Sequence, residues 1–150
     1  IEMIEAVGEE FWPTYFAKVD EILAPGGRAG IQAITMVDTH FASYRRHCDW
    51  IQKYIFPGGL LPSIGEVVRV TAAHTTLGLF GLEDRPLDYA RTLEAWRRRF
   101  FERLDRVRAL GFDDRFVRMW EYYLALSEAG FDTGLVQDLQ VVLEKRRGLL

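Results

Sequence analysis

Apolar residues recur along this chain with two different spacings, one typical of helices and one of buried strands. A spacing of three and four residues extends over residues 12–23 and, at greater length, over residues 88–110, and it predicts amphipathic helices. The apolar stripe of the second helix consists of Tyr89, Leu93, Trp96, Phe100, Leu104 and Val107. A continuous apolar run over residues 29–37 has the length of a buried strand.

Shorter signals predict the remaining elements. Ser63 and Glu66 have the spacing of a capping box, so a helix is expected from Ser63 to about Ala73. Two more helices are expected, over residues 39–54 and from Asp113 or Asp114 to about Ala129. Three more strands are expected, at residues 1–6, 75–82 and 139–143.

The order of these elements, β-α-β-α-α-β-α-α-β, predicts an α/β layered fold. About four strands make a small sheet, which leaves one edge strand without a neighbour and part of one face uncovered. The first strand also lacks its beginning. We therefore interpret residues 1–150 as one partial domain, half of a doubly wound fold.

Composition narrows the class of protein. The chain has 150 residues and a net charge of −3, which gives no general argument for binding nucleic acid. No apolar run approaches the roughly 18 residues of a membrane-spanning helix. The single cysteine, Cys48, excludes an internal disulfide and suits a reducing compartment, so a cytoplasmic location is expected. Neither Cys48 nor His40, His47 and His74 show the spacing of metal ligands, and no metal site is expected.

One loop is unusually apolar. Residues 52–63, QKYIFPGGLLPS, hold five large apolar residues, two prolines, two glycines and one charge. Surface loops are normally polar because their backbone stays in contact with water. Two interpretations are open: Ile55, Phe56, Leu60 and Leu61 fill the core, or they form the wall of a site for an apolar ligand.

Four segments carry a recognisable pattern, and they occur in this order: IEMIEAVGEEFWPTYFAKVDEILAPGGRAGIQAIT at residues 1–35, IQKYIFPGGLLPS at residues 51–63, LDYARTLEAWRRRF at residues 87–100 and RFVRMWEYYL at residues 115–124. Together they resemble the C-terminal half of the cyclopropane-fatty-acyl-phospholipid synthases, a family that includes mycolic acid cyclopropane synthases and related lipid methyltransferases. The resemblance covers nearly the whole chain. It implies the C-terminal half of a class I, Rossmann-like methyltransferase fold with several added long helices.

The resemblance also implies a reaction. Such enzymes move the methyl group of S-adenosylmethionine to a cis double bond within a phospholipid acyl chain, and a carbocation forms on the chain. Loss of a proton to a bound bicarbonate then closes a cyclopropane ring, whereas some relatives leave a methyl or methylene branch. Because a carbocation must be kept from water, its site needs an apolar wall. Phe56, Leu60 and Leu61 are the residues expected to face the acyl chain.

By this resemblance, Glu5 is the carboxylate that holds the bicarbonate through hydrogen bonds. Tyr89 is expected to donate a hydrogen bond between the two anions, and its ring to attract positive charge. Gln32 stands where several family members have histidine, so it can position the bicarbonate but cannot relay a proton. Ile34 matches the isoleucine whose backbone lines the same pocket. Without the resemblance, Tyr89 is a stripe residue of its helix and Glu5 an acid at a helix N-terminus.

The cofactor site is expected to be incomplete in these 150 residues. Ile1 and Val7 are expected near the sulfonium cofactor, but no G-x-G-x-G motif and no acidic residue for its ribose are present. Three alternatives stay open: the chain is the C-terminal part of a longer enzyme, it is one half of a split enzyme, or it is a relative that only binds acyl chains. A missing N-terminal half or a homodimer partner is expected accordingly.

The arginines of residues 97–108 allow two interpretations. They form a solvated face that pairs with Glu94, Glu102 and Asp105, or they contact anionic lipid headgroups. The second interpretation would bring the protein to the inner face of the membrane as a peripheral protein. Trp96 and Trp120 lie on apolar stripes and are expected in the core.

Overall fold

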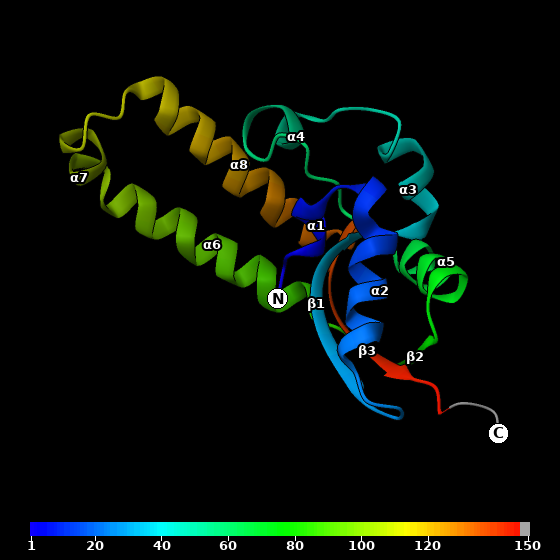
Figure 1. Ribbon diagram of the computed structural model, residues 1–150. Helices are drawn as coiled ribbons and strands as arrows, with labels where there is room; N and C mark the ends of the chain where they lie inside the picture. The colour runs from blue at the N-terminus through cyan, green and yellow to red at the C-terminus, as the bar shows by residue number, and fades with distance from the viewer. Residues whose placement is uncertain (148–150) are drawn as a thin grey trace. The chain divides into compact units, whose positions relative to one another are not determined.

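The computed structural model describes residues 1–147, which form two compact units. Among these residues, unit 1 comprises 1–84 and 136–147, and unit 2 comprises 85–135. The elements of unit 1 are α1 (Ile4–Val7), the 3-10 helix η1 (Glu9–Phe11), α2 (Trp12–Ile22), β1 (Arg28–Met36), α3 (Asp38–Tyr44), α4 (Trp50–Tyr54), α5 (Ile64–His74), β2 (Leu77–Asp84) and β3 (Val136–Lys145) (Figure 1). Those of unit 2 are α6 (Pro86–Glu102), α7 (Leu104–Ala109) and α8 (Asp114–Asp132).

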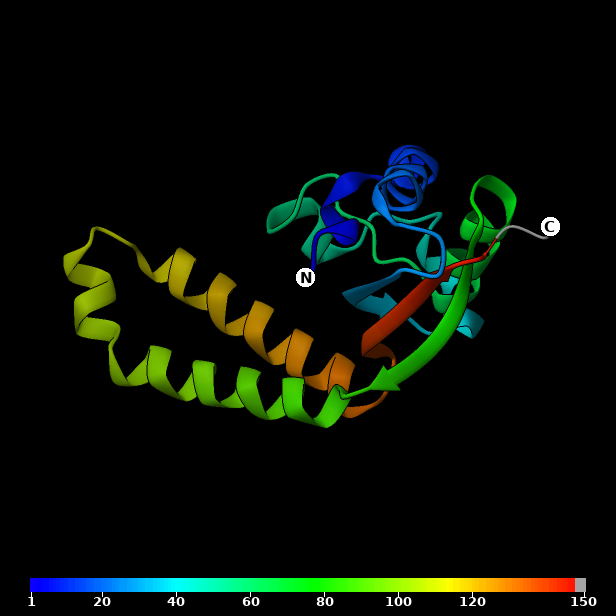
Figure 2. The same ribbon diagram turned by 60° about the horizontal axis from the view of Figure 1, so that its bottom comes forward.

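The sheet of unit 1 has the strand order β1-β3-β2, and β3 runs antiparallel to both neighbours. Because side chains alternate along a strand, Leu139, Val141 and Leu143 of β3 share one face, and all three are buried. Helices α2 and α5 pack against this layer (Figure 2). The side chains that they bury there are Trp12, Phe16, Val67 and Val70. This apolar layer is the core of unit 1.

Three of the four predicted strands are confirmed as β1, β2 and β3, and the one predicted at residues 1–6 is wrong. That segment meets the edge of β1 through the Glu2 N–H, which donates to the Gln32 carbonyl at 2.8 Å. It then turns into helix α1, which buries Ile4 in the core. The indole N–H of Trp12 donates to the Ile4 carbonyl at 3.2 Å and holds this turn in place.

Two helices that were predicted as continuous are each divided. Residues 39–54 form α3 and α4, because Asp49 begins a new helix with its own capping box. In this box the Gln52 N–H donates to the Asp49 carboxylate at 2.7 Å and the Asp49 N–H donates to the Gln52 side chain at 2.8 Å. Residues 88–110 form α6 and α7, which are divided at Arg103. Trp96 of α6 is 48% exposed, so its expected place in the core is also wrong.

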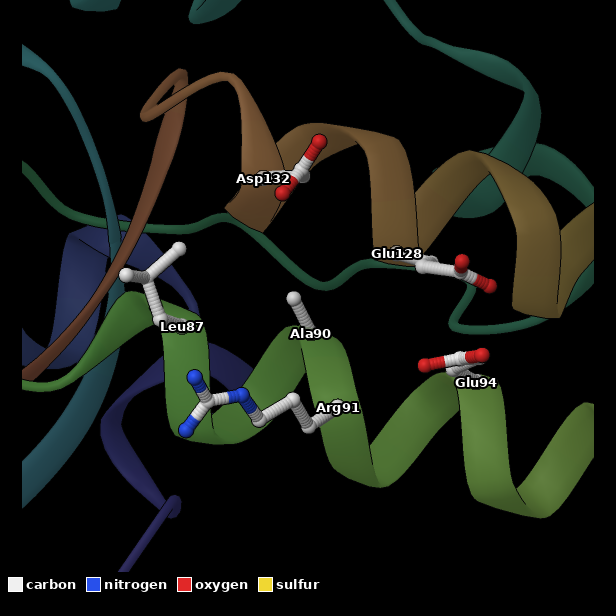
Figure 3. Close-up of a pocket in the computed structure, with 6 residues that line it drawn as sticks. All are labelled: Leu87, Ala90, Arg91, Glu94, Glu128 and Asp132. Carbon is white, nitrogen blue, oxygen red and sulfur yellow. The ribbon is translucent and has the colours of Figure 1, made fainter.

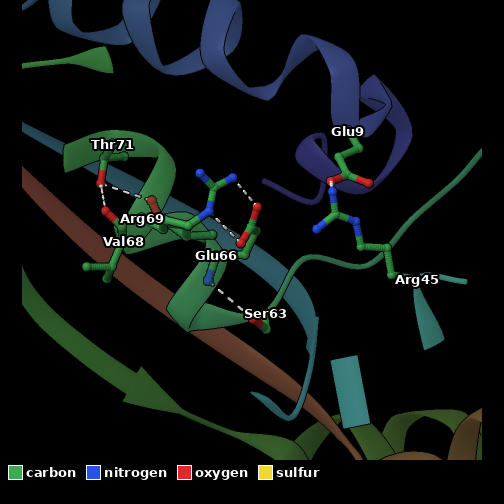
Figure 4. Close-up of polar contacts among 8 residues, drawn as sticks. Glu9, Arg45, Ser63, Glu66, Val68, Arg69 and Thr71 are labelled. Atoms are coloured by element: carbon green, nitrogen blue, oxygen red, sulfur yellow. Dashed lines mark hydrogen bonds and ion pairs between the residues drawn. The ribbon is translucent and has the colours of Figure 1, made fainter. Parts of the chain in front are cut away.

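The predicted N-caps are confirmed. The Ser63 hydroxyl accepts from the Glu66 N–H at 3.2 Å, and the Asp113 carboxylate accepts from the Phe116 N–H at 2.8 Å. The capping box at Ser63 is only half formed, because the Glu66 carboxylate binds Arg69 one turn further on (Figure 4). The hydrogen bond from Arg69 lowers the pKa of Glu66.

Asp20 ties α2 to β3 and to the residue that precedes β2. Its carboxylate accepts from the N–H and the hydroxyl of Thr76, at 2.9 and 2.8 Å. Lys145 Nζ donates to the Asp20 carbonyl at 2.5 Å and lies 3.5 Å from the carboxylate. Burial acts to raise the pKa of Asp20, but the hydrogen bonds from Thr76 and the charge of Lys145 outweigh it, and the pKa is lowered.

Replacing Asp20 with alanine is expected to lower the free energy of unfolding at neutral pH by about 1–3 kcal/mol. The folded-state pKa of Asp20 lies below its ordinary value of 3.8, so its stabilisation is present above that value. It is lost as the pH falls through the lowered folded-state pKa. Urea unfolding at a series of pH values should therefore show the wild type and the variant converging in acid. Glu21→Ala, which removes an exposed carboxylate on the same helix, is the control; equal stability of Asp20→Ala and wild type at pH 7 would contradict the expectation.

Candidate active site

Glu5 lies beside the outer edge of β1, the edge that faces away from β3. Its Oε1 accepts from the Ile34 N–H at 2.5 Å. A half-buried backbone N–H at a strand edge needs an acceptor, and the Glu5 carboxylate takes the place that a neighbouring strand would fill. The structure thus brings together two residues that the sequence assigned to one pocket.

The second carboxylate oxygen, Glu5 Oε2, is buried and has no hydrogen-bond partner within residues 1–147. Burial raises the pKa of Glu5, against the opposing effect of hydrogen bonds from its own amide and from that of Ile34. Burial also raises the pKa of Tyr15, and the negative charge of Glu5 adds to that rise, which places Tyr15 within electrostatic reach. An ionised carboxylate oxygen can only accept hydrogen bonds. Glu5 Oε2 is therefore suited to a ligand that brings a donor.

The apolar loop between α4 and α5 is fastened to the same region by four hydrogen bonds. They run from the Leu60 N–H to the Glu5 carbonyl (2.9 Å), from Gln52 Nε2 to the Gly59 carbonyl (3.0 Å), from the Leu61 N–H to the Tyr44 hydroxyl (3.3 Å) and from the Met36 N–H to the Pro62 carbonyl (2.9 Å). Burial raises the pKa of Tyr44 to about 12, so its hydroxyl stays protonated at neutral pH. A Cβ on Gly59 would lie 3.1 Å from the Phe56 carbonyl, which explains glycine at this close approach.

The two interpretations of this loop hold for different residues. Leu60 and Leu61 are half-buried and pack against the core of unit 1. Phe56 is 57% exposed, so most of its ring lies at the surface. Of the three residues expected to face an acyl chain, Phe56 is therefore the one with the most surface to offer a ligand.

The other predicted residues of unit 1 lie in different surroundings. Gln32 is half-buried on β1, and its Nε2 donates to Glu2 Oε1 at 2.9 Å. Ile1, which was expected beside the cofactor, is 90% exposed. Val7, expected at the same site, is half-buried and packs against the core. Ile1 is thus the more accessible of the two.

Tyr89 lies on α6 in unit 2. Its ring stacks on that of Phe131 from α8, with 4.5 Å between the ring centroids and 17° between the planes. Glu5 belongs to unit 1, so the pairing of Glu5 with Tyr89 stays a prediction. The aromatic stack fixes the plane of the Tyr89 ring within its own unit.

A polar pocket opens between α6 and α8 (Figure 3). Its lining consists of Leu87, Ala90, Arg91, Glu94, Glu128 and Asp132. Glu128 is engaged by Arg97, whose Nε and Nη2 donate to it at 3.0 and 3.3 Å. Three carboxylates do not suit a hydrocarbon ligand, and Tyr89 is not part of this lining.

Sequence reasoning missed Asp138, a buried acid on β3 that is 7% exposed. It lies opposite Ile34 in the strand register, on the central strand of the sheet. The available signal was an acid that interrupts the apolar alternation of this strand; the predicted strand began one residue later, at 139. Ile34 thus stands between Asp138 of β3 and Glu5, which meets the other edge of β1.

Within residues 1–147, no group of three histidine, cysteine, aspartate or glutamate side chains is placed to hold a metal ion. In the same residues, no helix combines the length and the apolar character that crossing a bilayer requires.

The fold defines the class of protein: it matches the α/β fold of solved methyltransferase structures. A crystal structure of the mycolic acid cyclopropane synthase CmaA1, complexed with SAH and CTAB, matches with a TM-score of 0.84 at 23% sequence identity. The match covers 97% of this chain and 53% of that chain. The family model of mycolic acid cyclopropane synthetase matches residues 1–141, and the chain belongs to this family.

Curated relatives agree with this assignment. The tuberculostearic acid methyltransferase UfaA1 of Mycobacterium tuberculosis (strain ATCC 25618 / H37Rv) is 49% identical over 143 residues, which are 95% of this chain and 34% of the relative. The cyclopropane-fatty-acyl-phospholipid synthase of Escherichia coli (strain K12) is 35% identical over 149 residues, which are 97% of this chain and 36% of the relative. The chain thus spans about a third of the length of both relatives.

Proposed function

We propose that the full-length gene product transfers the methyl group of S-adenosylmethionine to the double bond of an unsaturated phospholipid acyl chain, forming a cyclopropane ring or a methylene branch. The observation that carries this proposal is the buried, unpartnered Glu5 Oε2 at the edge of β1, beside an apolar loop that hydrogen-bonds to the same residue. A carbocation reaction on a fatty chain needs two features. One is an apolar surface that excludes water, and the other is a hydrogen-bond acceptor that holds the anion in place.

The residues at the β1 edge fit a bicarbonate ion. The hydroxyl of the ion can donate to Glu5 Oε2, which is buried and accepts from no other group in the described chain. The hydroxyl of the ion would lie between the two negative charges, which lowers the cost of seating an anion beside an ionised carboxylate. Bound there, bicarbonate supplies a base for the proton that is lost as the ring closes. Ile34 orients Glu5 through its backbone N–H, and Gln32 is proposed as a positioning group.

The apolar side of the site is proposed to run along the loop between α4 and α5. Phe56 supplies the exposed ring, and the hydrogen bonds of Leu60 and Leu61 hold the loop against the core. The related CmaA1 structure contains the lipid-like detergent CTAB together with SAH, which supports a hydrocarbon ligand and an S-adenosylmethionine cofactor for this fold. On the cofactor side, the exposed Ile1 is the residue of this chain proposed to contact S-adenosylmethionine.

The test is mass spectrometry of the phospholipids of cells that express the full-length gene, with a gain of one CH₂ unit per modified acyl chain as the expected result. In the same cells, Phe56→Asp should lower the fraction of modified acyl chains about tenfold. A charge on the apolar wall weakens binding of the acyl chain and draws water into the site. Phe56→Leu keeps an apolar wall and is the control. An unchanged lipid mass would overturn the proposed function. Modification at the wild-type level by Phe56→Asp would overturn only the proposal that Phe56 forms part of the apolar wall.

A further inference from the structure

The charges of unit 2 are separated along its two long helices. We define the hairpin tip as residues 98–118, which comprise the end of α6, all of α7, the connection to α8 and the start of α8 (Figure 2). The tip contains seven arginines and four carboxylates, a net charge of +3. The rest of unit 2, residues 85–97 and 119–135, contains three arginines and five carboxylates, a net charge of −2. The hairpin tip is thus a basic region of a chain whose net charge is −3.

Most of these arginines are not neutralised within the chain. Arg98 lies 3.9 Å from Glu102, and Arg108 lies 3.0 Å from Asp114. The other five are exposed and form no ion pair with any residue between 1 and 147; they are Arg99, Arg103, Arg106, Arg115 and Arg118. Ion pairing within the described residues therefore involves only two of the seven arginines, and only the pair of Arg98 and Glu102 lies along one helix.

Two apolar side chains project from the same end. Leu110 is 77% exposed and Phe112 is 44% exposed, on either side of Gly111, whose φ of +92° makes the turn between α7 and α8. The ring of Phe112 stacks on Phe116 at 4.1 Å between centroids, so it is anchored to α8 rather than loose. The boundary between lipid headgroups and acyl chains presents both negative phosphate groups and an apolar interior. Unpaired arginines match the phosphate groups, and the exposed apolar side chains match the interior.

We propose that the hairpin tip docks onto the surface of an anionic lipid bilayer. Leu110 and Phe112 enter the headgroup region, and the unpaired arginines, Arg106 and Arg115 nearest to this turn in sequence, bind lipid phosphate. The proposal rests on the proposed function, because a phospholipid substrate is taken from a bilayer. A lipid surface fits better than nucleic acid, because nucleic acid would gain nothing from the exposed Leu110.

The experiment is co-sedimentation of the full-length protein with phosphatidylcholine vesicles, with and without phosphatidylglycerol. Wild type should bind the mixed vesicles and release them as salt is added. Arg106→Gln should lower the partition coefficient on the mixed vesicles about fivefold, the typical contribution of one basic residue near an anionic surface. Leu110→Gln should lower it by a similar factor, and the fold should tolerate the change because Leu110 is 77% exposed. The control is Arg91→Gln, which removes an arginine whose side chain is 76% exposed at the other end of α6.

Equal partition coefficients of wild type, Arg106→Gln and Leu110→Gln would overturn the docking surface. A reduction of the partition coefficient in Arg91→Gln as large as that in the tip variants would also overturn it. If Leu110→Gln changes the sedimentation mass of the protein in the absence of lipid but leaves vesicle binding intact, the tip is a contact between two copies and the proposal is wrong. The proposed function is judged separately: modification of detergent-dispersed phospholipid should persist in the tip variants. A protein that binds vesicles through the tip but modifies no lipid would overturn the proposed function and leave the docking surface standing.

Discussion

Glu5→Gln is expected to reduce the turnover of the full-length enzyme by roughly a hundredfold or more while it makes the fold more stable at neutral pH. The glutamine oxygen can still accept from the Ile34 N–H, which lies 2.5 Å from Glu5 Oε1, so the edge of β1 keeps its acceptor. What is lost is the charged oxygen Oε2, which is buried and unpartnered within residues 1–147. A neutral amide costs less to bury than a carboxylate but cannot replace it as the acceptor for the hydroxyl of a bound bicarbonate ion.

The sign of the stability change follows from the pKa of Glu5. Burial raises this pKa above its ordinary value of 4.5, so the folded state is destabilised once the pH exceeds that value and the group ionises. The variant lacks this cost. Its advantage in thermal unfolding should be present at pH 7 and vanish as the pH falls below the ordinary value.

Steady-state turnover and thermal unfolding, measured on the same preparations, check both halves of the expectation. Glu10→Gln removes an exposed carboxylate nearby and should leave both quantities near wild type. Wild-type turnover in Glu5→Gln would remove this residue from the mechanism. Joint loss of stability and turnover would instead assign Glu5 the role of an edge cap for β1.

Tyr89→Phe is expected to lower turnover by roughly a hundredfold, on the scale of a lost acid–base or electrostatic group. The change deletes only the hydroxyl, because phenylalanine can keep the stack on Phe131 at the same 4.5 Å centroid distance. Thermal unfolding of the same preparation separates a loss of turnover from a loss of stability. The loss should appear in kcat, since the family resemblance implies that the hydroxyl donates a hydrogen bond to the bound anion rather than binds the acyl chain.

The matched control is Tyr122→Phe on α8, where the tyrosine is 49% exposed. Tyr89→Leu adds a second comparison, because it removes the aromatic face together with the hydroxyl. If the face stabilises a cation, Tyr89→Leu should be slower than Tyr89→Phe. Turnover by Tyr89→Phe at the wild-type rate would show that the hydroxyl takes no part in the reaction.

Several elements could be predicted from local sequence because the forces that form them act over a few residues. Ser63 and Asp113 begin their helices through hydrogen bonds to amides three residues away. The apolar run at residues 29–37 becomes β1, since a strand with this pattern needs only a core to face. The resemblance of the four quoted segments led to the family, which the match over residues 1–141 establishes.

Other elements needed the tertiary structure. The apolar segment at residues 1–6 reads as a strand, but Ile4 is held in a helical turn by the indole of Trp12, eight residues away. The stripe of residues 88–110 predicts one helix, yet it is divided at Arg103. Apolar periodicity continues through such a break, so the pattern alone does not reveal it.

By itself, the sequence determined the residue types of the candidate site: a carboxylate at Glu5, an apolar loop around Phe56 and an aromatic stripe that includes Tyr89. Only the tertiary structure decided that Glu5 contacts the backbone of Ile34, 29 residues away, and that Leu60 donates to the Glu5 carbonyl. The physical reason is that the raised pKa and the buried, unpartnered oxygen of Glu5 come from burial, and burial is set by segments that meet only when the chain folds.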